Sequence, residues 1–113
     1  MSHITTHVLD VSLGRPAANV SVILEAQSPT GEWAEAARST TDADGRLREW
    51  PAAKVLPAGI YRLTFDTRAY FAARKITSLY PQVDIVFEVR DAQEHYHIPL
   101  LLSPFGYSTY RGS

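Results

Sequence analysis

Four histidines are the side chains in this sequence best suited to proton transfer or metal binding: His3, His7, His95 and His97. Free imidazole titrates near ~6.5, so a histidine can act as a base at neutral pH. His95 and His97 are two residues apart in a segment that alternates like a β-strand, which places both side chains on one face. Such a pair can provide two metal ligands or a general base. The plain alternative is a surface or hydrogen-bonded role, which we expect for His3 near the chain end.

A second group of candidate ligands is the segment Asp42-Ala43-Asp44-Gly45. Its carboxylates match part of a calcium-binding loop, but the further oxygen ligands and the closing glutamate of such a loop are missing. Asp-Gly is a strong signal for a tight turn, so we interpret the segment as a turn. The sequence contains no cysteine, which excludes thiolate nucleophiles, disulfides and zinc–thiolate sites.

Composition narrows the class of protein further. The 113 residues include 11 Lys and Arg against 12 Asp and Glu, a net charge of −1, so a basic surface for nucleic acid is not expected. With 45% hydrophobic and 20% charged residues, the chain is globular in composition, and its length predicts one domain over residues 1–113. No apolar stretch approaches the ~20 residues of a membrane span, and no secretory signal is visible, so we expect a cytoplasmic protein without membrane contact.

Alternating apolar and polar residues predict that β-strands hold the candidate side chains in place. The clearest case is the segment 19–27, in which Val20, Val22 and Leu24 share one face. Similar alternation predicts strands over 6–12, 60–67 and 83–90. Further strands are expected over the alanine-rich segment 33–40, over 46–50 after the Asp-Gly turn, and over 94–101 and 105–110. The Asp-Gly turn is expected to fold 46–50 back along 33–40 as a hairpin. About eight short strands with regular turn signals are typical of an all-β sandwich of two sheets.

One short helix is expected over 67–75, with Asp66 or Thr67 capping its start. Its buried face is expected to hold the residues at helical spacing, Ala69, Ala72, Ala73 and Ile76. Pro99 falls within a predicted strand but cannot donate a ladder hydrogen bond, so we expect it at an edge, at a bulge or unpaired. The core is expected to contain most of the large aromatic side chains, Trp33, Trp50, Tyr61, Phe65 and Phe87.

Three motifs, spread in order from the first strand to the chain end, link this sequence to a known family. They are Thr6-His7-Val8-Leu9-Asp10, Thr41-Asp42-Ala43-Asp44-Gly45-Arg46, and a terminal segment that ends in Tyr110-Arg111-Gly112-Ser113. With these motifs the whole chain resembles the 5-hydroxyisourate hydrolases, which are transthyretin-related enzymes of urate degradation. The resemblance implies a transthyretin-like β-sandwich and a homotetramer whose sites lie between subunits.

The resemblance also implies an activity, the hydrolytic opening of 5-hydroxyisourate to 2-oxo-4-hydroxy-4-carboxy-5-ureidoimidazoline, with no cofactor and no metal. The catalytic residues of the family match His7, Arg46 and His97 here. Arg46 would also bind the purine-derived substrate, together with the terminal residues Tyr110, Arg111, Gly112 and Ser113. We expect His7 and His97 to deprotonate water, while the arginines hold the anionic substrate.

Three alternatives remain open at this stage. A transthyretin-like carrier would bind small molecules without catalysis. A metal site could be built on His95 and His97. An immunoglobulin-like interaction module would need neither a catalytic site nor a metal site. The sequence does not identify which histidine is the general base, because two close imidazoles titrate as a pair.

Overall fold

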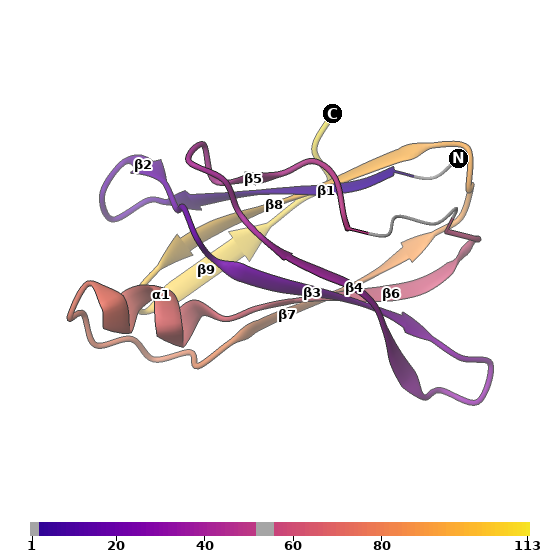
Figure 1. The fold of residues 1–113 in the computed structure, drawn as a ribbon, viewed down its shortest axis with the longest axis horizontal. Coiled ribbons are helices and arrows are strands. Elements are labelled where there is room, and N and C mark those ends of the chain that lie inside the picture. The colour runs from indigo at the N-terminus through magenta and orange to yellow at the C-terminus, as the bar shows by residue number, and fades with distance from the viewer. Residues whose placement is uncertain (1–2, 52–55) are drawn as a thin grey trace.

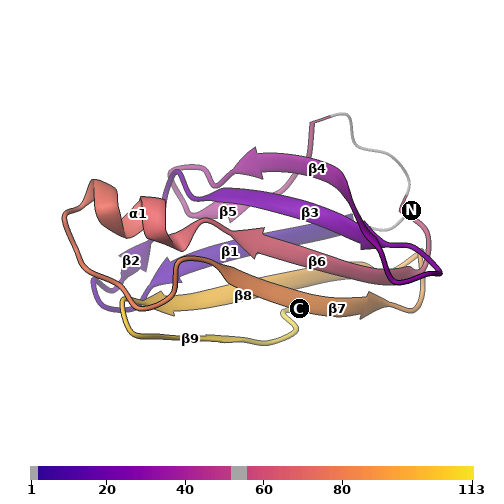
Figure 2. The same ribbon diagram turned by 90° about the horizontal axis from the view of Figure 1, so that it is seen from below.

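The protein is described by a computed structural model that covers residues 3–51 and 56–113. The described residues form two β-sheets packed face to face, with one short helix at one end of the sandwich (Figure 1, Figure 2). The elements are β1 (His3–Asp10), β2 (Arg15–Pro16), β3 (Ser21–Gln27), β4 (Trp33–Thr40), β5 (Arg46–Leu47), β6 (Gly59–Phe65), α1 (Thr67–Ala73), β7 (Val83–Val89), β8 (His95–Ser103) and β9 (Gly106–Thr109). The predicted two-sheet sandwich with one helix is confirmed, and β2 is an additional strand at a predicted turn.

The first sheet has the strand order β2-β1-β8-β9, and β5 pairs with β1 alongside β2. The second sheet has the order β4-β3-β6-β7. Between the sheets lies a core built from alternate residues of each strand, as the period of a half-buried strand requires. Its largest fully buried side chains include Tyr61, Phe65, Phe71, Leu24, Leu63, Leu100 and Val22. Burying each of these contributes about 1.5–3 kcal/mol to folding.

The pairing of β1 with β8 positions the candidate site. These two strands run parallel over their whole length, from His3 opposite His95 to Asp10 opposite Leu102. The register sets Thr5 opposite His97 and His7 opposite Pro99. A parallel pair needs a long connection between its strands, and here all four strands of the second sheet lie between them in the sequence. The first and last motifs of the chain are therefore neighbours on one sheet.

The turn at Asp42-Ala43-Asp44-Gly45 forms as expected, but the strand after it has a different partner. The N–H of Asp42 donates to the Arg46 carbonyl at 2.9 Å, which closes the turn. The predicted hairpin with β4 is wrong, because β5 pairs with β1 in the other sheet, with Arg46 opposite His7. The chain crosses between the sheets here because Leu47, at 2% exposure, joins the core from the side of β1.

Helix α1 begins where the sequence predicts but buries another face. The Asp66 carboxylate caps it by accepting the Ala69 N–H at 3.2 Å. The expected alanine face is wrong: Ala69, Ala72 and Ala73 are exposed. The helix instead buries Thr67, Tyr70 and Phe71, since aromatic rings remove far more apolar surface from water than methyl groups do.

The expectation for Pro99 is met in its last alternative, since it is unpaired on one side, whereas the expectation that Trp33 lies in the core is wrong. Pro99 does not lie on an edge strand, because β8 has β1 on one side and β9 on the other. It does interrupt pairing with the C-terminal segment: β9 ends at Thr109 opposite Leu100, and the next backbone bridge joins His97 to Gly112. Trp33 is not a core residue, because its half-exposed ring supports the Arg62 guanidinium, 4.4 Å from the ring centroid.

Candidate active site

Alternation along β1 and β8 turns a row of polar side chains onto the outer face of the first sheet. Ile4 and Val8 of β1 point into the core, so Thr5 and His7 between them point away from it. The C-terminal segment leaves β9 and passes β8 on the side of the sandwich away from the second sheet (Figure 1). The result is a hollow of about 280 Å³ lined by Thr5, Arg46, Arg48, His95, His97 and Ser113.

The turn before β5 places Arg46 beside this hollow. The Asp42 carboxylate accepts the N–H groups of Asp44 at 2.8 Å and Arg46 at 3.0 Å, which shapes the loop. Gly45 has a φ of +73°, and a Cβ there would lie 2.4 Å from the Val8 carbonyl oxygen. The Gly45 carbonyl accepts the Val8 N–H at 2.7 Å. Glycine is therefore required both for the backbone conformation and for close docking on β1.

His7 is held by the same turn. Its Nε2 lies 3.0 Å from the Asp44 carbonyl oxygen, and because a carbonyl only accepts, Nε2 carries the hydrogen and the neutral ring keeps its lone pair on Nδ1. Burial and the positive charge of Arg46 lower the pKa of His7, although the Asp44 carbonyl opposes them. His7 is thus neutral and basic near pH 7.

His97 is one of two imidazoles that line the hollow, and His95 is the other. Nδ1 of His97 lies 2.7 Å from the Thr5 hydroxyl oxygen, which leaves Nε2 as the ring nitrogen available to a molecule in the hollow. Burial lowers the pKa of His97, and the neighbouring His95, Arg46 and His7 lower it further. A neutral imidazole beside a fixed cation can accept a proton while the cation binds an anion.

The C-terminal segment is fastened next to His97. The Gly112 N–H donates to the His97 carbonyl at 2.8 Å. A Cβ on Gly112 would lie 2.5 Å from Cδ2 of His97 and 3.2 Å from Cγ of Pro99, so glycine alone permits this approach. Ser113 then reaches the hollow itself.

Arg111 points to another side of the sheet. Its guanidinium lies 4.5 Å from the ring centroid of Tyr96 and 3.8 Å from the Glu94 carboxylate, and it donates to the His95 carbonyl at 3.3 Å. It lines a separate hollow of about 330 Å³ with Tyr96 and Glu94. Tyr110 is 57% exposed. Within one chain, the fold therefore brings together Arg46, His97 and Ser113 with His7 beside them, and it places Arg111 and Tyr110 elsewhere.

Four residues that line the hollow are not among the expected site residues: Thr5, Thr6, Arg48 and His95. Of these, only His95 was considered from the sequence, as a metal ligand or base together with His97. The alternation of side chains along β1 could have identified Thr5, since Thr5 lies two residues before His7 and so shares its face. His95 shares a face with His97 by the same rule. Among residues 3–51 and 56–113, no group of three His, Cys, Asp or Glu side chains is placed to hold a metal ion.

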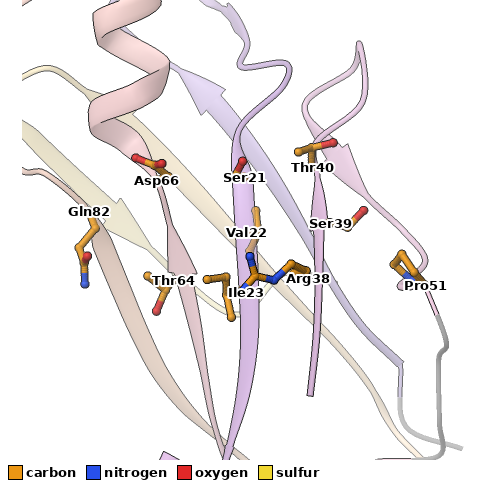
Figure 3. A pocket seen from close by; sticks show the side chains of 10 residues that line it. All are labelled: Ser21, Val22, Ile23, Arg38, Ser39, Thr40, Pro51, Thr64, Asp66 and Gln82. Carbon is orange, nitrogen blue, oxygen red and sulfur yellow. The ribbon is translucent and has the colours of Figure 1, made fainter. Parts of the chain in front are cut away.

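A larger hollow, of about 560 Å³, lies over strands β3, β4 and β6 of the second sheet (Figure 3). Its charged side chains have structural partners: Arg38 is paired with Glu35, and Asp66 caps α1. No histidine lines it, so we place the candidate chemistry on the first sheet. No helix in the described part of the chain is long and apolar enough to cross a membrane.

The two-sheet topology and the cationic, imidazole-lined hollow define a transthyretin-like protein with a polar site. The chain belongs to the HIUase/Transthyretin family, whose family model matches residues 4–112. The 5-hydroxyisourate hydrolase of Salmonella dublin is 42% identical over 111 residues, which span 97% of this chain and 80% of that protein.

Solved structures give the same assignment of fold. Klebsiella pneumoniae 5-hydroxyisourate hydrolase matches with a TM-score of 0.85 and 40% identity, over 98% of this chain and 99% of that one. Sea bream transthyretin in complex with thyroxine matches with a TM-score of 0.90 and 33% identity, over 96% and 93% of the two chains. The transthyretin-like fold expected from the sequence motifs is confirmed.

Proposed function

We propose that this protein is a 5-hydroxyisourate hydrolase that converts its purine-derived substrate to 2-oxo-4-hydroxy-4-carboxy-5-ureidoimidazoline. The observation that carries this proposal is the hollow on the first sheet, where His97 and Arg46 lie together with His7 beside them. The 5-hydroxyisourate hydrolases of Salmonella dublin, at 42% identity, and of Mus musculus, at 41% identity, support it.

The residues of the hollow suit hydrolysis of a cyclic amide. A neutral histidine removes a proton from water, the hydroxide adds to the carbonyl carbon, the ring C–N bond breaks, and the leaving nitrogen takes up the proton. We assign the base to the His7 and His97 pair. We assign Arg46 to binding the anionic substrate and the oxyanion, because a guanidinium offers several donors in one plane.

The terminal residues have proposed binding roles. Ser113 lines the hollow and the Gly112 backbone lies against His97, which supports a place for both at the substrate. Tyr110 and Arg111 are exposed and lie outside the hollow of their own chain. We propose that they contact substrate only in the assembled protein, where sites form between subunits.

We propose a homotetramer as the active form. Strands β7 and β9 are the outer strands of their sheets, and such edges pair readily with another chain. Apolar side chains are exposed around them, including Val86 at 58%, Phe105 at 67% and Tyr107 at 43%. Burying these in an interface would stabilise a small domain. We further propose one transthyretin-like domain over residues 1–113, no resident metal or cofactor, and a cytoplasmic location.

Transthyretin itself supplies the second candidate, because the sea bream protein that matches this fold is in complex with thyroxine. A carrier of an apolar ligand needs an apolar cavity. The hollow on the first sheet is instead lined by Arg46, Arg48, His95 and His97, so we favour hydrolysis over carriage.

The test is a spectrophotometric assay on freshly prepared 5-hydroxyisourate, with light scattering to measure the assembly. We expect turnover well above the spontaneous rate, unchanged by chelators, and a loss of at least ~100-fold in kcat for His97→Asn. His3→Asn is the matched control and should keep wild-type turnover. A wild-type tetramer that leaves the spontaneous rate unchanged contradicts the proposed activity.

A further inference from the structure

The side chains of Thr5, His95 and His97 form a connected group on the outer face of the first sheet. The Thr5 hydroxyl oxygen lies 2.7 Å from Nδ1 of His97 and 2.9 Å from Nε2 of His95. The parallel register sets Thr5 directly opposite His97. One threonine on β1 therefore reaches both imidazoles, which lie two residues apart on one face of β8.

A hydroxyl has one hydrogen, which limits how this group can be bonded. If Nδ1–H of His97 donates to the Thr5 oxygen, then the Thr5 hydroxyl donates to Nε2 of His95. In this first arrangement the lone pair of His97 lies on Nε2, so His97 is a base toward the hollow. In the reverse arrangement, Nε2–H of His95 donates to Thr5, the hydroxyl donates to Nδ1 of His97, and Nε2 of His97 carries a hydrogen.

We propose that Thr5 is a positioning residue that sets the tautomer of His97 and links it to His95, so that a proton taken from water by His97 is carried on to His95. The inference rests on the proposed hydrolysis and assigns roles to two residues beyond its catalytic set. His95 thereby has a function, as the group that stores the proton between the two halves of the reaction.

The protons balance in both directions. Nε2 of His97 takes a proton from water, its Nδ1 proton moves to the Thr5 oxygen, and the Thr5 proton moves to Nε2 of His95. The hydroxide adds to the substrate carbonyl, His97 is neutral with a hydrogen on Nε2, and His95 is an imidazolium. When the ring C–N bond breaks, Nε2–H of His97 protonates the leaving nitrogen, and the two transfers reverse. Thr5 and both histidines end as they began.

Exposure to solvent distinguishes the two imidazoles. His97 is half-buried, whereas His95 is exposed, and water stabilises an imidazolium better than a partly desolvated site does. Burial and nearby positive charge also lower the pKa of His97. The groups that face His97 are His95 on its own strand, Thr5 and His7 on β1, Arg46 and Arg48 on the turn side, and Ser113. Of these groups, Arg46 carries a fixed positive charge that disfavours a cation on His97.

Two substitutions at Thr5 separate the hydroxyl from the shape of the side chain. Thr5→Val keeps the volume and removes the bond to both rings, and we expect kcat to fall about tenfold to a hundredfold with little change in KM. Thr5→Ser restores the hydroxyl and should recover kcat to within about threefold. Thr40→Val removes a threonine hydroxyl from the end of β4 in the other sheet and should leave kcat unchanged.

A double-mutant cycle tests the link to His95. His95→Gln alone should lower kcat about as much as Thr5→Val, and the double variant should lose little more than either, because both break one chain of proton transfer. His95 is exposed, so His95→Gln keeps the test valid if Thr5→Val does not fold. Losses that multiply in the double variant overturn the relay.

Nitrogen-15 NMR of the histidine rings in the resting tetramer tests the tautomer without any turnover. We expect His97 to be neutral with its hydrogen on Nδ1 in the wild type, and to populate both tautomers in Thr5→Val. A wild-type kcat and pH profile for Thr5→Val, with an unchanged His97 tautomer, overturns the inference. If the wild type does not hydrolyse 5-hydroxyisourate, the proposed function fails, while the NMR result still decides whether Thr5 controls His97.

Discussion

The backbone N–H of Gly112 donates to the carbonyl of His97 at 2.8 Å, and the two residues lie so close that a Cβ on Gly112 would be 2.5 Å from Cδ2 of the imidazole. The end of the chain is thus fitted against the ring that we assign to proton transfer. A substitution here tests whether this contact sets the position of the ring.

Gly112→Ala is expected to displace His97 or the terminal segment and to lower kcat at least ~10-fold, since a misplaced catalytic group is costly. The sandwich should remain, because Gly112 lies outside its core. Turnover and far-ultraviolet circular dichroism measure the two effects. Gly106→Ala is the control, because a Cβ there meets its nearest atom, Oγ of Ser103, at 3.7 Å. Equal activity of both variants would contradict the prediction.

Gly45→Ala should destabilise the protein more than Gly14→Ala does. Both glycines have positive φ, +73° and +68°, but a Cβ on Gly45 would lie 2.4 Å from the Val8 carbonyl oxygen while one on Gly14 meets nothing within 4 Å. An alanine with positive φ costs each variant about 1–3 kcal/mol of stability. The clash with the Val8 carbonyl oxygen adds to this cost only in Gly45→Ala. Urea unfolding of the two variants gives the difference, and equal free energies of unfolding would show that the turn does not dock tightly on β1.

The hydrogen bond from Tyr70 to Asp10 is expected to contribute to stability. The Tyr70 hydroxyl donates to the fully buried Asp10 carboxylate at 2.7 Å, and burial together with Asp10 raises the pKa of Tyr70 to about 12. Tyr70→Phe leaves a buried carboxylate oxygen without this donor and should cost about 1.5–3 kcal/mol in chemical denaturation. Tyr80→Phe, on a half-buried loop ring packed against Tyr107, is the control. A loss for Tyr70→Phe no larger than for the control refutes this role.

The lowered pKa values of His7 and His97 predict the response to acid. Burial is the first cause for both, with Arg46 acting on each. As the pH falls, a histidine in the unfolded chain binds its proton near pH ~6.5, whereas His7 and His97 in the folded state bind theirs at lower pH. Their contribution to the free energy of unfolding is therefore complete above that pH and is lost as the pH drops below it. Activity should follow the folded pKa values, with an acid limb centred below 6.5. A kcat/KM profile centred above 6.5 contradicts this assignment.

Much of the local structure was predictable from particular residues. The alternating segment 83–90 agrees to within one residue with β7 (Val83–Val89), since short-range alternation is enough to define such a strand. The Asp42 to Gly45 turn formed because its hydrogen bonds are local. The alanine face of the helix and the hairpin partner of residues 46–50 were wrong, because bulky aromatic packing and a crossover to the other sheet depend on residues distant in the sequence.

The sequence by itself determined the side chains available for chemistry, their alternation along strands, and the motifs that identify the family. Tertiary structure decided which of them meet. Thr5 and His97 are 92 positions apart and become neighbours only through the parallel register of β1 and β8. The same register, together with the end of the chain, put Ser113 at the hollow and Arg111 against Tyr96. Pairing between distant strands follows from burying the whole core at once, which local patterns do not encode.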